Sequence, residues 1–306
     1  MVGRDELKPP IFLLGNVRSG TTMIQRILGM HPEVVTWFEP RPIWVYADPK
    51  RPHDRFVEAD ATEPVKRYIR RRFLRYQRAH GGLRIMEKTP SNLMRIPYVQ
   101  AIFPEARYIY TVRNPLSCLS SAELKWQQEI TWGKTRRRIA ETPLIHLPYY
   151  GRLWLREKFR RRVLRQKYTR LWGVRYPGIE NDVGKLSVEE IVAKQWVACC
   201  RQADQDLAEW HEENLLRIRY ETFVADPVAE SRRVCEHVGL PFPDELADRI
   251  AAFVDPNRQG KWRRLDRDVF ARCLPVLCDE MRRQGYEVPD DLVELIGAEA
   301  APSPAG

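Results

Sequence analysis

The sequence lacks any long hydrophobic run, and this absence excludes several classes of protein. No stretch approaches the roughly 20 apolar residues that a membrane-spanning helix needs. Residues 1–10 contain no apolar core of the kind found in a secretory signal. The chain of 306 residues is long enough to bury a full core of its own, and we expect it to be cytoplasmic.

Cysteine is scarce and is not arranged for cross-linking. The six cysteines include no C-x-x-C pair, and most of them lie within helical patterns. We therefore expect reduced, buried thiols rather than a disulfide framework or a zinc site. No other residue pattern predicts a metal, and no nucleic-acid recognition module is recognisable, so neither a metal nor a nucleic acid is expected as a ligand.

Positive charge is abundant, but it is unevenly distributed. The chain carries a net charge of +10. Residues 134–175 contain fourteen Lys and Arg against two acidic residues, so the rest of the chain carries −2. Within this segment Leu155, Phe159 and Val163 form an apolar stripe at helical spacing. Either this helix is a solvated cover of the core, or residues 152–168 attract an anionic acceptor or make peripheral contact with a membrane.

The most informative stretch is a glycine-bearing loop between a predicted strand, residues 11–14, and a predicted helix. Gly15 and Gly20 lie five residues apart, as in phosphate-binding loops of the form G-x-x-x-x-G-K-[ST], but Thr21 occupies the lysine position. Without that lysine the loop is poorly suited to the terminal phosphates of ATP or GTP. Its backbone N–H groups can still hold one phosphate. An ordinary strand-turn-helix is the alternative.

Further strands alternate with helices along the chain. Strands are predicted at residues 34–37, 83–86, 107–112 and 215–220. The intervening residues have helical patterns, including a helix that Ser91 is expected to cap and that runs to Ile102. This alternation predicts a central parallel sheet flanked by helices, an α/β fold.

Four charged residues lie where predicted strands end. These residues are Arg18, Glu39, Lys88 and Arg113. Because ligands bind at the carboxyl ends of strands in parallel sheets, their positions predict an active site. Ser121 follows Arg113 by eight residues and could join it at a second anion site, although an arginine after a strand is also a common ion-pair residue.

Several spaced motifs together resemble those of the sulfotransferase family. In order, they are VRSGTT (17–22), EKTP (87–90), FPEARYIYTVRNPLSCLSS (103–121), RIRYETFVADP (217–227) with GLP (239–241), and GKWRR (260–264). The resemblance covers roughly residues 11–126 and 190–286. It implies a fold similar to that of P-loop NTPases and the use of 3′-phosphoadenosine 5′-phosphosulfate (PAPS) as donor, without a metal. The base position is similar to that of the tyrosylprotein sulfotransferases.

The resemblance also implies roles for particular residues around the nucleotide. The residues implied to bind the 5′-phosphosulfate are Arg18, Ser19, Gly20, Thr21 and Thr22. Those implied to bind the 3′-phosphate are Arg113 and Ser121, with Lys125 as a further candidate. Those implied to close over the nucleotide are Tyr220, Arg258, Gly260, Lys261 and Trp262.

The sequence departs from the cytosolic members of the family at the catalytic base. Those members place a histidine after their lysine-threonine motif, whereas Lys88-Thr89 is followed here by Pro90. Glu39 is the replacement that the resemblance to the tyrosylprotein sulfotransferases favours; the alternative is that Glu39 only pairs with Arg41 or another cation. Lys88 would neutralise charge on the bridging oxygen as the nucleotide leaves.

The sequence therefore predicts a PAPS-dependent sulfotransferase acting on a hydroxyl by in-line displacement. The acceptor could be a saccharide, a glycolipid, a tyrosine or a small metabolite. A non-catalytic nucleotide- or anion-binding module and a nucleoside or nucleotide kinase are the alternatives. We expect one domain over residues 1–297 with a basic, partly helical insertion at about 127–185, and a disordered tail at 298–306.

Overall fold

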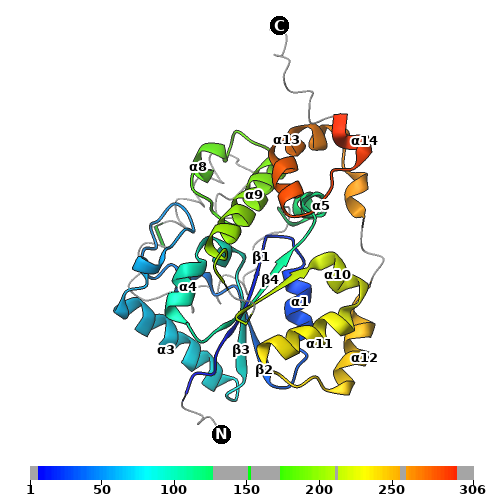
Figure 1. Ribbon diagram of the computed structural model, residues 1–306. Helices are drawn as coiled ribbons and strands as arrows, with labels where there is room; N and C mark the ends of the chain where they lie inside the picture. The colour runs from blue at the N-terminus through cyan, green and yellow to red at the C-terminus, as the bar shows by residue number, and fades with distance from the viewer. Residues whose placement is uncertain (1–5, 127–150, 153–172, 211–212, 256–259, 295–306) are drawn as a thin grey trace.

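A computed structural model of the chain describes residues 6–126, 151–152, 173–210, 213–255 and 260–294. Five parallel strands form a single sheet in the order β2-β3-β1-β4-β5 (Figure 1). The strands are β1 Ile11–Gly15, β2 Val34–Phe38, β3 Arg84–Lys88, β4 Arg107–Val112 and β5 Leu215–Arg219. The prediction of a parallel α/β sheet is thus confirmed, although β3 runs two residues further than expected and includes Lys88 itself.

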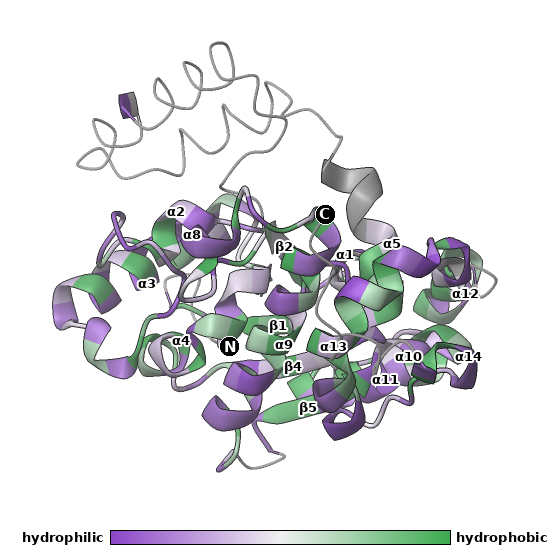
Figure 2. Cartoon of the chain, turned by 90° about the horizontal axis from the view of Figure 1, so that it is seen from above, coloured by the Kyte–Doolittle hydropathy of each residue, from purple (hydrophilic) through white to green (hydrophobic). Residues whose placement is uncertain are grey.

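Helices cover both faces of the sheet, because successive side chains of each strand point to opposite faces. On β1, Phe12 and Leu14 pack in one apolar cluster, while Ile11 and Leu13 pack in another. Seen from above, apolar strands lie at the centre and helices with hydrophilic stretches surround them (Figure 2).

The helices divide into three groups by the cluster in which they pack. The first face is covered by α2 Arg41–Trp44, α3 Glu63–Ala79, α4 Ile96–Ile102, α8 Ile179–Asp182 and α9 Val188–Asp206. The second face is covered by α1 Thr21–Leu28, α10 Tyr220–Ala225, α11 Pro227–Val238 and α12 Asp244–Phe253. A third cluster joins α9 to α5 Pro115–Trp126, α13 Arg267–Arg283 and α14 Asp290–Val293.

The ends of the helices follow from local side-chain chemistry. Ser187 and Glu190 form a reciprocal capping box at the start of α9. Asp226 accepts a hydrogen bond from the backbone N–H of Ala229 and starts α11, which ends at Gly239 in a left-handed conformation with φ of 70°. Short 3₁₀ turns lie at Glu58–Asp60, Pro90–Met94 and Lys261–Arg264.

The prediction of one helix from Ser91 to Ile102 is wrong in one respect. Residues Pro90–Met94 form a 3₁₀ turn, the chain breaks at Arg95, and α4 begins only at Ile96. The break has a physical cause at Pro97, which has no N–H group to donate and is tolerated only in the first turn of a helix. The residue that precedes α4 is Arg95 rather than Ser91, which lies inside the 3₁₀ turn.

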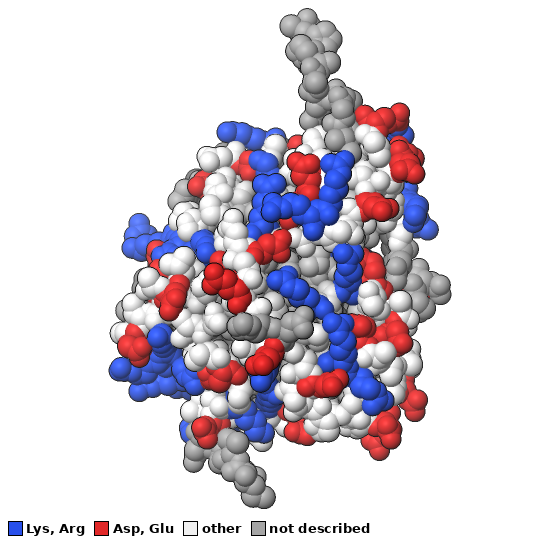
Figure 3. Space-filling model, viewed as in Figure 1, with Lys and Arg blue, Asp and Glu red and all other residues white. Residues whose placement is uncertain are grey.

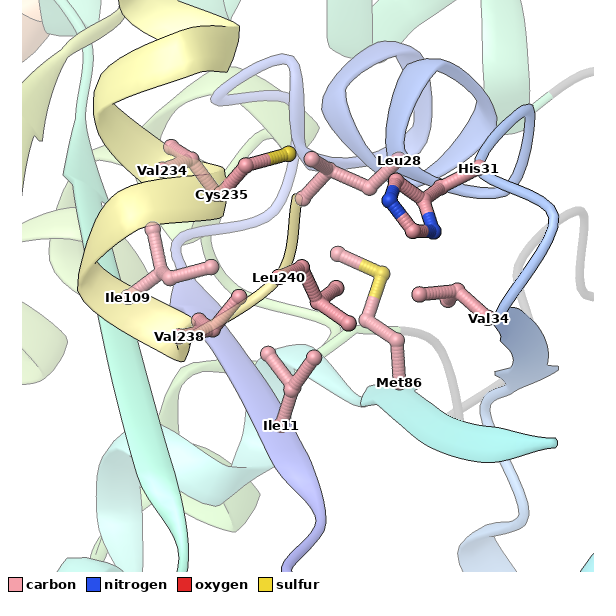
Figure 4. Close-up of a pocket in the computed structure, with 10 residues that line it drawn as sticks. All are labelled: Ile11, Leu28, His31, Val34, Met86, Ile109, Val234, Cys235, Val238 and Leu240. Carbon is pink, nitrogen blue, oxygen red and sulfur yellow. The ribbon is translucent and has the colours of Figure 1, made fainter. Parts of the chain in front are cut away.

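A small cavity in the described part of the chain lies away from the carboxyl edge of the sheet. It has a volume of about 10 Å³ and lies between β1, β3, β4 and α11, where Figure 4 shows the surrounding side chains. Nearly all of these side chains are apolar; the exception is His31, whose ring bonds the carbonyl of Pro241 at 2.7 Å. The cavity is a packing defect of the second face rather than a ligand site.

Candidate active site

The carboxyl ends of all five strands meet at one edge of the sheet. The residues that follow or end these strands are Arg18, Glu39, Lys88, Arg113 and Tyr220. The structure therefore brings together, at one edge, four charged residues and a tyrosine that are separated by up to two hundred residues of chain. Among the described residues, no group of three or more His, Cys, Asp or Glu side chains could hold a metal ion.

The glycine loop after β1 is packed so tightly that side chains are excluded at two positions. A Cβ atom added at Gly15 would lie 2.5 Å from the Thr21 methyl group. One added at Gly20 would lie 2.0 Å from the ring of Tyr220, and the φ of Gly20 is 82°. Both positions therefore require glycine, for close approach at Gly15 and for close approach and backbone conformation at Gly20.

The loop presents the free N–H groups of a helix at the edge of the sheet. Gly20 precedes the first turn of α1 without a capping side chain, and that turn contains no acidic residue. The N–H group of Met23 donates to the carbonyl of Gly20 at 2.9 Å, whereas those of Thr21 and Thr22 precede the first intrahelical bond. The helix dipole adds partial positive charge there. Ser19 is fully buried and donates to the carbonyl of Asn16 at 2.7 Å, so its hydroxyl stabilises the loop itself.

Arg18 joins the loop to α5. Its backbone has a positive φ of 66°, which is uncommon for a residue with a side chain. Its Nε donates to the Oγ of Ser121 at 2.8 Å, and Nη2 donates to the same oxygen. The side chains of Arg18 and Ser121 thus meet, although 103 residues separate them.

Arg113 lies beside Arg18 and has an unused donor. Its Nη1 donates to the carbonyl of Arg18 at 3.0 Å, and its guanidinium lies 4.2 Å from the centre of the Tyr220 ring. Its Nε is buried and has no hydrogen-bond partner among the described residues. Burial lowers the pKa of Arg18, and the positive charge of Arg113 lowers that pKa further. Two adjacent guanidinium groups with an open donor fit an anion, which would relieve their repulsion and accept the hydrogen bond.

The second half of the edge holds Lys88, Glu39 and Arg41. Lys88 Nζ lies 3.0 Å from Oε1 of Glu39, and Arg41 Nη2 lies 3.3 Å from Oε2. The ion pair with Arg41 that the sequence left open is therefore present, together with a second one. Glu39 is 19% exposed and has a positive φ of 48°. The sequence named Arg41 only as a possible ion-pair partner of Glu39 and gave it no role in the site.

Lys88 connects this half to the glycine loop. Its side chain is 2% exposed, and its Nζ lies 3.4 Å from the Oγ1 of Thr22 as well as 4.1 Å from the centre of the Phe38 ring. Burial lowers the pKa of Lys88, and the charge of Glu39 opposes that shift. Lys88 thus lies between the carboxylate of Glu39 and the first turn of α1.

Glu87 points to the opposite face of the sheet from Lys88. It is fully buried and accepts hydrogen bonds from Thr89, from Asn92 at 2.8 Å and from Trp44 at 3.3 Å. Burial raises the pKa of this carboxyl to about 7. Because Trp44 ends the short helix that follows Glu39, Glu87 connects the segment of Glu39 to the end of the Lys88 strand. The sequence showed Glu87 only as a member of the EKTP motif.

The remaining predicted residues lie at the side of the edge or outside the described residues. Gly260 has φ of 76° and begins the turn Lys261–Arg264, which packs on α5. Trp262 in that turn is half-buried and lies edge-on to Phe270. Arg258, the side chains of Lys125 and Lys261, and most of the basic insertion lie outside the described residues.

Comparison with known proteins decides the family. The model of the sulfotransferase family matches residues 9–171 and 153–244, which together span most of the chain. The chain belongs to the sulfotransferase family. The matched region contains the glycine loop, Glu39, Lys88, Arg113 and Tyr220.

Two curated relatives are similar to this sulfotransferase-family chain over different lengths. Nodulation protein NoeE of Sinorhizobium fredii is 29% identical over 133 residues, which are 38% of this chain and 31% of that protein. Protein-tyrosine sulfotransferase A of Caenorhabditis elegans is 22% identical over 257 residues, which are 80% of this chain and 53% of that protein. The chain therefore spans between about a third and a half of the length of these two relatives.

Solved structures share the fold at low sequence identity. The sulfotransferase domain from the curacin biosynthetic pathway is 17% identical, with a TM-score of 0.50 over 93% of this chain and 100% of that one. Sulfotransferase STF9 from Mycobacterium avium is 14% identical, with a TM-score of 0.51 over 92% of this chain and 78% of that one. The fold is thus the P-loop-like α/β fold of sulfotransferases. No described helix is long and apolar enough to cross a membrane.

Proposed function

We propose that the chain transfers the sulfuryl group of PAPS to a hydroxyl of an acceptor, with Glu39 as the general base. One observation carries the proposal: a tightly packed glycine loop, an arginine donor without a partner among the described residues and a Lys–Glu pair share one edge of the sheet. A base at the position of Glu39 could serve any acceptor with a hydroxyl group. Such an acceptor could be a saccharide, a glycolipid, a tyrosine or a small metabolite.

The donor would bind across the two halves of the edge. The N–H groups of Thr21 and Thr22 at the start of α1 suit the 5′-phosphosulfate, and neither Gly15 nor Gly20 leaves room for a side chain beside them. Arg113 and Ser121 suit the 3′-phosphate, because Arg113 Nε has no partner among the described residues. Arg18, which the sequence assigns to the 5′-phosphosulfate, donates to Ser121 and would lie between the two sites. Tyr220 packs against Gly20 and Arg113, where it would stiffen both sites.

The chemical roles follow from where the two charged side chains lie. Bound PAPS supplies an electrophilic sulfur whose bond to the bridging phosphate oxygen breaks while the acceptor oxygen bonds to it. Glu39 would take the hydroxyl proton, which requires the ionised carboxylate. The ion pairs of Glu39 with Lys88 and Arg41 stabilise that ionised form. Lys88, next to Thr22, would offset the negative charge that grows on the bridging oxygen.

The decisive experiment is to compare nucleotides by calorimetry with the purified chain. Binding of 3′-phosphoadenosine 5′-phosphate should exceed that of 5′-AMP by at least tenfold, because charge-assisted hydrogen bonds to the extra phosphate are worth about 1.5–3 kcal/mol each. ATP serves as the control for a kinase. Equal affinity for 3′-phosphoadenosine 5′-phosphate and 5′-AMP, or preference for ATP, would refute the donor assignment. Tight binding of the first nucleotide without sulfuryl transfer to any hydroxyl would indicate a binding module.

A further inference from the structure

The outer face of α3 presents a row of arginines that the active site does not use. The helix Glu63–Ala79 contains seven Lys and Arg and one acidic residue. Its buried side chains, Val65, Ile69, Phe73 and Gln77, all point into the first face of the core. On the opposite side Arg67, Arg71 and Arg75 are exposed, each one helical turn after the last. We call these three residues the α3 arginine row.

The α3 arginine row differs from the other cations of the same helix because it is not neutralised. Arg70 pairs with Glu105 at 2.8 Å, and Lys66 pairs with Glu63 at 3.3 Å. Within the part of the chain that the structure describes, no carboxylate pairs with any member of the row. Like charges four residues apart destabilise a helix by about 0.2–0.5 kcal/mol per pair. The row therefore has a cost in the free protein that an anionic partner would remove.

The shape of this surface indicates what kind of partner fits. The helix α3 forms an outer edge of the molecule (Figure 1), and Lys and Arg side chains gather over it in the space-filling view (Figure 3). A rise of 1.5 Å per residue places the three arginines about 6 Å apart along a line of about 12 Å. A row on a convex edge can meet a plane with all of its charges at once, whereas a linear polyanion is held best in a groove.

The residues around the α3 arginine row indicate that this surface contacts its partner without inserting apolar side chains into it. The exposed large hydrophobic residues of the described chain are Val57, Phe253 and Val293, and none of them lies on α3. A membrane-inserting helix would show Trp, Phe or Leu on its outer face. The attraction offered by the α3 arginine row is therefore electrostatic and screened by salt.

We propose that the α3 arginine row docks the protein on a membrane surface that contains anionic lipids. The row would lie against the lipid headgroups, and α3 itself would not enter the hydrocarbon. This inference does not depend on the sulfotransfer reaction, since none of the three arginines lies at the carboxyl edge of the sheet.

The test is sedimentation of the full chain with vesicles of phosphatidylcholine, with and without phosphatidylserine. The wild type should bind only the vesicles that contain phosphatidylserine, and raised salt should release it. Replacing all three residues, Arg67→Gln, Arg71→Gln and Arg75→Gln, should weaken partition by about 100-fold, from about fivefold for each arginine near an anionic surface. Because the three side chains are exposed and their mutual repulsion is removed, this variant should melt at the temperature of the wild type or slightly above it.

A matched control separates position from net charge. Arg26→Gln, Arg232→Gln and Arg282→Gln remove the same charge from exposed sites scattered over α1, α11 and α13. This control should bind vesicles within about twofold of the wild type. The proposal is wrong if both triple variants lose binding equally, if the row variant binds as well as the wild type, or if the wild type ignores the vesicles. Retention on an acidic polymer without vesicle binding would also overturn it and would assign the row to a linear polyanion.

Discussion

The carboxyl edge of the sheet has two halves that differ in how their charges are paired. At the ends of β1 and β4, Arg18 and Arg113 pair with no carboxylate among the described residues, where the Nε of Arg113 also has no hydrogen-bond partner. At the ends of β2 and β3, each oxygen of Glu39 already faces a cation. In the arginine half an anion would supply the missing counter-charge. In the glutamate half the carboxylate is already paired with two cations, although the Nε of Arg41 has no hydrogen-bond partner among the described residues. Removing a cation from the first half should weaken binding, and disturbing the second half should slow the chemical step.

The largest effect is expected from Lys88→Met, which removes a charge from the glutamate half. We expect the turnover number to fall by about 10³-fold, because one fixed donor at developing negative charge is worth about 10²–10³ in rate. Rates with saturating PAPS and calorimetry with 3′-phosphoadenosine 5′-phosphate provide the measurement. Lys194→Met, which removes a surface ion pair with Asp182, is the control. If Lys88→Met lost nucleotide affinity and kept its turnover number, the contrast between the two halves would be wrong.

The next largest effect is expected from Glu39→Gln. This change keeps the shape of the side chain and removes the group that takes the proton, so turnover should fall by about 10² or more with nucleotide affinity nearly intact. Glu33→Gln, an exposed change six residues earlier, should have no effect. Wild-type turnover in Glu39→Gln would make Glu39 a structural residue and place the base elsewhere.

The same variant makes a prediction about pH. The charge of Glu39 opposes the lowering of the Lys88 pKa by burial, so Glu39→Gln should lower that pKa further. Lys88 would then lose its proton at a lower pH than in the wild type. The alkaline limb of the pH profile of the residual turnover should therefore move toward lower pH. A limb at an unchanged pH would mean that Lys88 is not the group that titrates there.

A smaller effect, on affinity alone, is expected from Arg113→Gln. Loss of the charge-assisted hydrogen bonds should weaken binding of 3′-phosphoadenosine 5′-phosphate by about ten- to 100-fold. Affinity for 5′-AMP should hardly change, because that nucleotide lacks the 3′-phosphate. Arg219→Gln, at the end of neighbouring β5, is the matched control. An equal loss for both nucleotides would mean that Arg113 acts through the fold of the loop rather than through the 3′-phosphate.

The smallest effect is expected from Arg41→Gln. Its pair with Glu39 is 3.3 Å long and partly exposed, and such pairs contribute about 0–1 kcal/mol. Lys88 would remain on the other carboxylate oxygen, so turnover should change by less than about tenfold. A loss as large as that of Glu39→Gln would show that Arg41, rather than Lys88, holds the carboxylate for reaction.

Local sequence patterns determined most of the secondary structure and the order of the motifs. The β-branched and aromatic run of β4 and the glycine loop after β1 are found where their patterns place them. The strand-helix alternation likewise determined that the sheet is parallel, since parallel strands need crossovers. These features depend on neighbours within one helical turn or one strand, which is the range over which a sequence pattern carries information.

The order of strands and the direction of side chains determined the rest. Nothing in the chain order says that β3 lies between β2 and β1, yet this placement brings Lys88 to both Glu39 and Thr22. Because side chains alternate along β3, Glu87 points to the opposite face, where it is buried and accepts hydrogen bonds from three side chains. The contact of Arg18 with Ser121 spans 103 residues and depends on the packing of α5 against α9. Such contacts arise only when distant segments share one core, so only the tertiary structure could decide which charges have partners and which remain open to a ligand.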